Sequence, residues 1–154
     1  PTAWRFVLIT PRDRQGLHGR RERAAFANLP PVPGDTTDAL VAELREVMIP
    51  AARAADFGAF SDSVYRYGRL AGECFASVQG GPYNGLHLQP LANRLTSAGF
   101  RGVGQSSWGP TIFFLSAEQR EAEQAVALIR AWSELAASDI LIAPPNNTGV
   151  RITT

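Results

Sequence analysis

The sequence contains the stretch Gly102-Val-Gly-Gln-Ser-Ser-Trp-Gly-Pro-Thr111, and the apolar run Ile112-Phe-Phe-Leu115 follows it directly. Three glycines lie within eight positions there. Glycine adopts backbone angles that other residues avoid, and it lets a ligand approach the main chain. The run after Pro110 is aromatic and branched, which predicts a buried strand. We therefore expect a polar, glycine-rich turn held by a strand, and the N–H groups of such a turn can face an anion.

The alternative interpretation of this stretch is a plain β-hairpin turn, because a short Gly/Ser run is a weak signal by itself. The chain has no Gly-x-x-x-x-Gly-Lys-Ser/Thr pattern. It also has no expected strand followed by a Gly-x-Gly-x-x-Gly run that opens a helix. The stretch therefore matches none of the well-defined phosphate-binding patterns.

Length and composition indicate one domain over residues 1–154, in a soluble globular protein. The chain is 45% hydrophobic and 19% charged, which is ordinary for that class. Its net charge is +1, from 15 basic and 14 acidic residues, so no basic face for nucleic acid is expected. No apolar run approaches the ~20 residues of a membrane span, and the start of the chain lacks a signal-peptide layout.

The single cysteine, Cys74, excludes a disulfide framework and a cysteine-based zinc site. It lies in a helical pattern beside Phe75, so we interpret it as a small core residue rather than a nucleophile. His18 and His87 have no metal-ligand spacing, and we expect no metal ligands in this chain. These features favour a reducing, cytoplasmic location. The chain has no initial methionine and opens almost at once on a strand, which suggests a fragment of something longer.

The order of the expected elements predicts an α+β fold. Period-two and apolar runs indicate strands at residues 5–10, 100–103, 112–115, 139–143 and 150–153. Apolar residues at helical spacing indicate helices from residue 35 to about 50, at 57–75, at 88–98 and at 118–134. This is the β-α-β-β-α-β plan of a ferredoxin-like sandwich, an antiparallel sheet backed by helices. Its first crossover is enlarged to about three helices.

Two further segments are expected as loops. Residues 11–36 are rich in Pro, Gly and Arg, and they include one short helix at 21–28. His18, Arg20 and Arg21 could meet an anion there, or the loop is simply solvated. The second loop is Val78-Gln-Gly-Gly-Pro-Tyr-Asn-Gly85. The apolar stripe of the helix at 57–75 is interpreted as a packed core face rather than a ligand wall.

The layout resembles the C-terminal domain of the GHMP superfamily, the small-molecule kinases of the galactokinase, homoserine kinase and mevalonate kinase type. In that family a glycine-rich third motif lies between two strands, where residues 102–111 lie here. The kinases usually carry a run close to Thr-Gly-Ala-Gly-x-Gly-Gly, which this chain lacks. The sequence at 102–111 is more similar to that of one branch, the β-ribofuranosylaminobenzene 5′-phosphate synthases of methanopterin biosynthesis. Other similar elements are Trp4-Arg-Phe-Val-Leu-Ile, Gly16-Leu-His-Gly19, Ala25-Phe26, Leu29-Pro30 and Val78-Gln-Gly-Gly81.

The resemblance implies that this chain is one domain of a longer, homodimeric enzyme and is inactive alone. The missing N-terminal domain would carry the superfamily's other phosphate loop. The family's reaction condenses 4-hydroxybenzoate or 4-aminobenzoate with phosphoribosyl pyrophosphate, and carbon dioxide and pyrophosphate leave. It implies Mg²⁺ and backbone N–H donors for the pyrophosphate. It also implies a site that positions both substrates and excludes water.

By this resemblance, the stretch at residues 102–111 binds ligand at the domain interface. The residues expected to do so are Gly102, Gly104, Gln105, Ser106, Ser107 and Gly109. Trp108 either stacks on an aromatic ring and caps the pocket, or acts as a hydrophobic lid on the core. Further candidates for the pocket edge are Gln79, Gly80, Gly81 and, less directly, His18. No residue is identified as the catalytic acid or base. Two alternative functions stay open: an ATP-dependent GHMP-type kinase, and a non-catalytic ferredoxin-like binding or dimerisation module.

Overall fold

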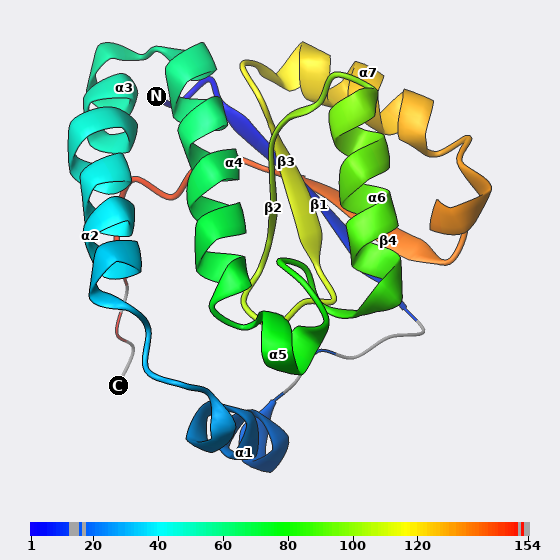
Figure 1. Cartoon of the computed structure of the whole chain (residues 1–154). Coiled ribbons are helices and arrows are strands. Elements are labelled where there is room, and N and C mark those ends of the chain that lie inside the picture. Colours follow the sequence, from blue (N-terminus) through cyan, green and yellow to red (C-terminus); the bar gives the residue numbers. More distant parts are fainter. Residues whose placement is uncertain (13–15, 17, 151, 153–154) are drawn as a thin grey trace.

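A computed structural model of the chain describes residues 1–12, 16, 18–150 and 152, and Figure 1 shows its arrangement. Its centre is a four-stranded sheet with the order β2-β3-β1-β4, in which every neighbouring pair is antiparallel. The strands are β1 (Arg5–Pro11), β2 (Arg101–Gln105), β3 (Ile112–Ser116) and β4 (Ser138–Ala143). This is the strand order of a ferredoxin-like sheet, so the predicted α+β class is confirmed.

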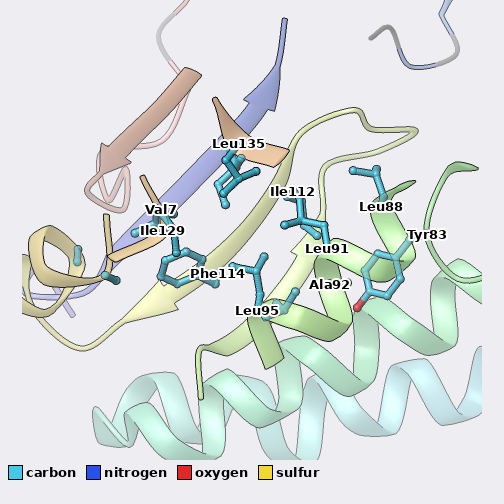
Figure 2. Close-up of a cluster of buried hydrophobic side chains, with 14 residues drawn as sticks. Val7, Tyr83, Leu88, Leu91, Ala92, Leu95, Ile112, Phe114, Ile129 and Leu135 are labelled. Atoms are coloured by element: carbon cyan, nitrogen blue, oxygen red, sulfur yellow. The ribbon is translucent and has the colours of Figure 1, made fainter. Parts of the chain in front are cut away.

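The core lies between the sheet and the helices α6 (Gly85–Ser97) and α7 (Gln119–Ile129). Val7 pairs with Phe114 and Ile9 pairs with Ile112 across β1 and β3, and none of the four side chains is exposed. Leu95 of α6 and Ile129 of α7 reach the same cluster, which Figure 2 shows. Alternate strand residues thus bury one apolar face, as period-two patterning requires.

The connection from β1 to β2 is mostly helical, as the sequence predicts. It contains α1 (Gly19–Asn28), α2 (Gly34–Ala42), the π-helix η1 (Glu43–Met48), α3 (Ile49–Ala54), α4 (Phe57–Glu73), α5 (Ala76–Gln79) and α6. Figure 1 shows α4 and α6 in front of the sheet, with α2 and α3 beside α4 on the side away from α6. Gly99, with a φ of 88°, ends α6 in the left-handed conformation expected of a helix C-terminus.

Pro50 does not end the helix before it, although the sequence predicts a helix that ends at about residue 50. Residues 34–54 are helical throughout, and the π-helix η1 precedes the proline. The N–H of Ile49 donates to the carbonyl of Leu44, five residues back. Proline lacks an N–H and crowds the preceding turn, and a wider π turn is one way for a helix to continue past it.

Helix α4 is fixed at its start by polar contacts. Asp56 caps it, because its Oδ1 accepts a hydrogen bond from the Ala59 N–H at 2.9 Å. Arg101, at the start of β2, donates to the Ser61 hydroxyl at 3.0 Å and pairs with Asp62 at 2.8 Å. These contacts hold α4 against strand β2.

Two expectations near the C-terminus need correction. Helix α7 ends at Ile129, before the expected residue 134, and a 3₁₀ turn η2 (Ser133–Leu135) follows. This change of path brings Leu135 into the core, where it is 4% exposed. The strand expected at 150–153 is not formed by Val150 or Ile152, and its other residues lie outside the described part. None of the described helices is long and apolar enough to cross a membrane.

Candidate functional site

Within the stretch at 102–111, residues 102–105 belong to strand β2, and residues 106–111 form a β-hairpin loop between β2 and β3. A hairpin turn is the alternative interpretation given above. The Ser106 N–H donates to the Thr111 carbonyl at 3.0 Å, and the Gly109 N–H donates to the Ser106 carbonyl at 2.9 Å. Ser107, at a φ of 50°, adopts the left-handed conformation inside this tight turn. The loop is therefore a structured turn that is held by its own backbone.

Two glycines of the stretch are explained by packing within the sheet. A Cβ at Gly102 would collide with the side chain of Leu115, and one at Gly104 would collide with the ring of Phe113. Both partners lie on the neighbouring strand β3. Cross-strand packing therefore favours glycine at these positions, and a direct ligand contact from Gly102 remains a prediction.

A network of side-chain amides joins the hairpin to the second glycine-rich segment. Gln105 accepts from the Asn84 N–H at 2.6 Å and donates to the Ser107 carbonyl at 2.7 Å. The Asn84 side chain donates to the Trp108 carbonyl. Gln79, at the end of α5, donates to the Gly72 carbonyl of α4 at 3.1 Å. Sequence reasoning missed Asn84, although it lies in the loop that was singled out.

A cavity of about 430 Å³ lies beside this network, within the size range of small-molecule sites. Its walls come from α1, η1, α4, α5, β2, β3 and the hairpin loop. It is lined by Phe26, Met48, Val64, Tyr67, Gly68, Ala71, Gly72, Phe75, Gln79, Pro82, Gly104, Gln105, Ser107, Trp108 and Phe113. Among these described lining residues none is charged, and most are apolar. The cavity therefore suits an uncharged, flat or apolar group.

Three aromatic rings from separate segments meet at one side of the cavity. The ring centroids of Phe75 and Trp108 are 5.0 Å apart, and those of Phe26 and Trp108 are 5.5 Å apart. Each pair among these three rings meets edge to face, which is an arrangement that aromatic pairs prefer. Trp108 is 4% exposed, whereas Phe26 on α1 is 52% exposed. Trp108 thus belongs to the wall, and Phe26 forms its outer cover.

The structure brings together five of the predicted site residues and separates the others. Gln79, Gly104, Gln105, Ser107 and Trp108 line the cavity, whereas Gly102, Ser106, Gly109, Gly80, Gly81 and His18 are not among its lining residues. His18 is exposed and immediately precedes α1. Whether any of these residues contacts a ligand remains a prediction.

Part of the cavity wall was not expected to face a ligand. Val64, Tyr67, Ala71 and Phe75 belong to the apolar stripe of α4 and its C-terminal end, which the sequence indicated as core, and all four line the cavity. Helical spacing alone gives the same stripe for a filled core and for a cavity wall. The small residues Gly68 and Gly72 on this stripe are the sequence feature that could have indicated a cavity wall instead of a filled core.

The described residues around the cavity do not fit a magnesium site. Magnesium is usually held by one or two carboxylates together with substrate phosphates, and no described lining residue carries a carboxylate. No group of three or more His, Cys, Asp or Glu side chains suited to a metal occurs in the part of the chain that the structure describes. The presence of Mg²⁺ remains a prediction.

Comparisons with known proteins find a similar curated protein and similar solved structures, whereas no family model matches. The relative is a β-ribofuranosylphenol 5′-phosphate synthase from Methanothermobacter thermautotrophicus, 27% identical over 119 residues, which are 77% of this chain and 35% of the relative. One of the similar solved structures is a homoserine kinase from Cytophaga hutchinsonii, with a TM-score of 0.50 and 15% identity. It matches over 95% of this chain and 42% of its own.

The similarity to the curated relative supports the predicted resemblance to a GHMP-superfamily C-terminal domain, and the homoserine kinase supports the fold of such a domain. The homoserine kinase shows the fold alone, because its identity to this chain is low. This chain spans about a third of the length of the curated relative and less than half of that of the kinase. Both similar proteins are enzymes.

Proposed function

We propose that this chain, a GHMP-superfamily C-terminal domain, is part of a synthase that joins an aromatic acid to phosphoribosyl pyrophosphate. The acid would be 4-hydroxybenzoate or 4-aminobenzoate, and the products a C-riboside, carbon dioxide and pyrophosphate. The observation that carries the proposal is the similarity to the β-ribofuranosylphenol 5′-phosphate synthase over 77% of the chain. The cavity beside the hairpin supports it, because its walls suit an aromatic ring.

The reaction can be balanced without a proton donor from this domain. The bond from the ribosyl carbon to pyrophosphate breaks, and a new bond forms to the ring carbon that carries the carboxylate. The electron pair of the ring–carboxylate bond then returns to the ring as carbon dioxide leaves. The described cavity lining lacks any Asp, Glu, His, Lys or Arg, which is compatible with this sequence of bond changes.

Water exclusion is a second contribution that the geometry supports. An activated ribosyl centre is hydrolysed wherever water reaches it, so the site must be dry. The rings of Phe26, Phe75 and Trp108 cover one side of the cavity. The amide network links the hairpin to Asn84, immediately before α6, and Gln79 joins α5 to α4. Under the proposal, this domain positions the acid and keeps water away from its bound ring.

The experiment uses the product of the complete gene that encodes these residues. It is incubated with phosphoribosyl pyrophosphate and either acid labelled in the carboxyl carbon, and the trapped carbon dioxide and the pyrophosphate are measured. We expect equal amounts of both products with at least one acid, and none without phosphoribosyl pyrophosphate. No carbon dioxide from either acid would overturn the proposal. In that case, substrate-dependent ADP formation from ATP would favour a GHMP-type kinase.

A further inference from the structure

The cavity contains one buried acceptor that the protein satisfies only weakly. Gln79 is 5% exposed, and its Nε2 is anchored on the Gly72 carbonyl at 3.1 Å. Its Oε1 receives only one contact from the described residues, a long one of 3.4 Å from the Gln105 Nε2. That same Nε2 makes a shorter bond of 2.7 Å to the Ser107 carbonyl. An amide oxygen has two lone pairs, so Gln79 Oε1 retains the capacity to accept a ligand's hydrogen bond.

The remaining walls recognise shape rather than charge. Along α4, Gly68 and Ala71 leave room where larger side chains would close the space, and both residues line the cavity. Phe75 and Trp108 supply ring edges and faces on another side. A flat aromatic ring packs well against such a surface and needs one polar partner for its orientation. Gln79 lines the same cavity and supplies that partner.

We propose that this cavity is the subsite for the aromatic ring of the acid, and that Gln79 Oε1 accepts a hydrogen bond from a donor at the ring's 4-position. The inference rests on the proposed function for the identity of the acid. The chemical class that the site would take is an aromatic acid with a hydroxyl or amino donor opposite its carboxylate. Such a ligand completes the hydrogen bonding of a buried amide that the protein leaves partly unsatisfied.

The same arrangement fixes the direction in which the ring enters. Burial of a carboxylate without a partner is costly, and the described lining offers it no cation. The uncharged 4-substituent therefore points to Gln79, and the carboxylate stays at the opening. Helix α1 carries Phe26 over the cavity and also carries the exposed residues Arg20, Arg21 and Arg23. Carbon dioxide then forms at the open end, where the ribosyl donor can approach.

The hydrogen bond also favours the chemistry. The ring carbon that is attacked lies opposite the 4-substituent. A hydroxyl or amino group that donates its hydrogen to Gln79 Oε1 becomes a better electron donor to the ring, and the positive charge that develops during attack is stabilised. Gln79 is thus a substrate-binding residue that would select donors at the 4-position and support their reaction.

The test measures binding of the acids without turnover, by equilibrium dialysis with the product of the complete gene. The probes are 4-hydroxybenzoate, 4-aminobenzoate, benzoate and 4-methoxybenzoate, the last of which is unable to donate. We expect the two donors to bind about three- to tenfold more tightly than the other two acids, the range for one neutral hydrogen bond. Gln79→Leu should remove this preference. A preference that survives Gln79→Leu would overturn the assignment of Gln79.

A cavity-filling variant tests the location of the ring. A Cβ on Gly68 meets no heavy atom within 4 Å, so Gly68→Leu can extend into the space along the α4 stripe. We expect all four acids to bind at least about tenfold more weakly, because the ring loses its volume and contacts. Gly34→Leu is the matched control, since Gly34 also has open space around it but does not line the cavity. Unchanged binding by Gly68→Leu would place the ring elsewhere.

The two proposals fail in distinguishable ways. If the acids bind with the expected preference and carbon dioxide is never released, the subsite stands and the synthase proposal falls. If carbon dioxide is released and Gly68→Leu leaves the KM for the acid unchanged, the synthase proposal stands and the subsite falls. Should Gln79→Leu prove unfolded by circular dichroism, the Gly68→Leu result and the comparison of the four acids still decide the location and the donor preference.

Discussion

The core and the cavity of this domain are both made of apolar side chains, but only the core is filled. On the core side, Ile9, Leu95, Phe114 and Ile129 have less than 2% of their surface exposed. On the cavity side, the α4 stripe includes Gly68, Ala71 and Gly72, and a space of about 430 Å³ remains. The composition of the two regions is similar, and the difference lies in where small residues interrupt the larger ones.

Phe113 and Phe114 are neighbours on β3, and one of them lies in each of the two regions. Successive strand side chains leave on opposite sides. Phe114 enters the core and stacks on Phe100 with centroids 4.4 Å apart, whereas Phe113 lines the cavity. We expect Phe114→Ala to lower the free energy of unfolding by about 3–5 kcal/mol. Phe113→Ala should lower the free energy of unfolding by less, about 1–2 kcal/mol, because Phe113 is only half-buried. Urea unfolding measures both, and equal losses would mean that the cavity side is packed as tightly as the core.

Two glycines of α4 should respond to substitution with opposite signs. A Cβ on Gly72 would collide with the carbonyl oxygen of Pro82, whereas one on Gly68 meets no heavy atom within 4 Å. We expect Gly72→Ala to lower the free energy of unfolding by about 1–3 kcal/mol through overpacking. Gly68→Ala should raise it by up to about 1 kcal/mol through helix propensity. Thermal unfolding of both variants decides this, and a shift of the same sign in both would contradict the open wall at Gly68.

Tyr83 is a polar exception on the core side. It is 3% exposed, and its hydroxyl has no hydrogen-bond partner among the described residues. Burial raises the pKa of Tyr83 to about 12, above the value of about 10 for an unfolded tyrosine. The stability that this shift contributes is present below pH 10 and is lost as the pH rises towards 12.

Tyr83→Phe should therefore raise stability at neutral pH by about 1 kcal/mol, because a buried hydroxyl without a partner is removed. It should also reduce the loss of stability between pH 10 and pH 12 that the wild type shows. Urea unfolding across this pH range is the measurement. Identical pH profiles for the variant and the wild type would show that Tyr83 titrates normally and is less buried than the core around it.

The smallest expected effect concerns a charge pair between α4 and η1. Arg66 of α4 donates to Glu43 of η1 at 2.7 Å, and this hydrogen bond holds the pKa of Glu43 below its ordinary value. A carboxylate with a lowered pKa contributes stability above its unfolded pKa, and that contribution is lost as the pH falls through the folded value. Because Arg66 is half exposed, Arg66→Ala should cost under about 0.5 kcal/mol at pH 7, and still less at pH 3. An undiminished cost at pH 3 would point to packing instead of charge.

Local patterns were sufficient for most of the scaffold. The branched and aromatic runs at 5–10, 112–115 and 139–143 form β1, β3 and β4, because a strand face that is buried needs alternate apolar residues. Gly99 ends α6 in the left-handed conformation, which glycine adopts most readily. A hairpin was one of the two interpretations of the stretch at 102–111, and residues 106–111 form that hairpin, whereas residues 102–105 are part of β2.

The sequence by itself therefore determined the strands, the main helices and the antiparallel plan, because these depend on residues close together along the chain. Only the tertiary structure decided which apolar helix faces are fully packed by other side chains and which face a cavity. The open space beside Gly68 depends on side chains from α1, η1 and the hairpin, far apart in sequence. The same is true of Gln79, because its partly satisfied oxygen depends on Gln105 and Ser107, which lie far from it in sequence. Spacing along one helix fixes which side chains share a face, but only the packing of distant segments fixes what that face meets.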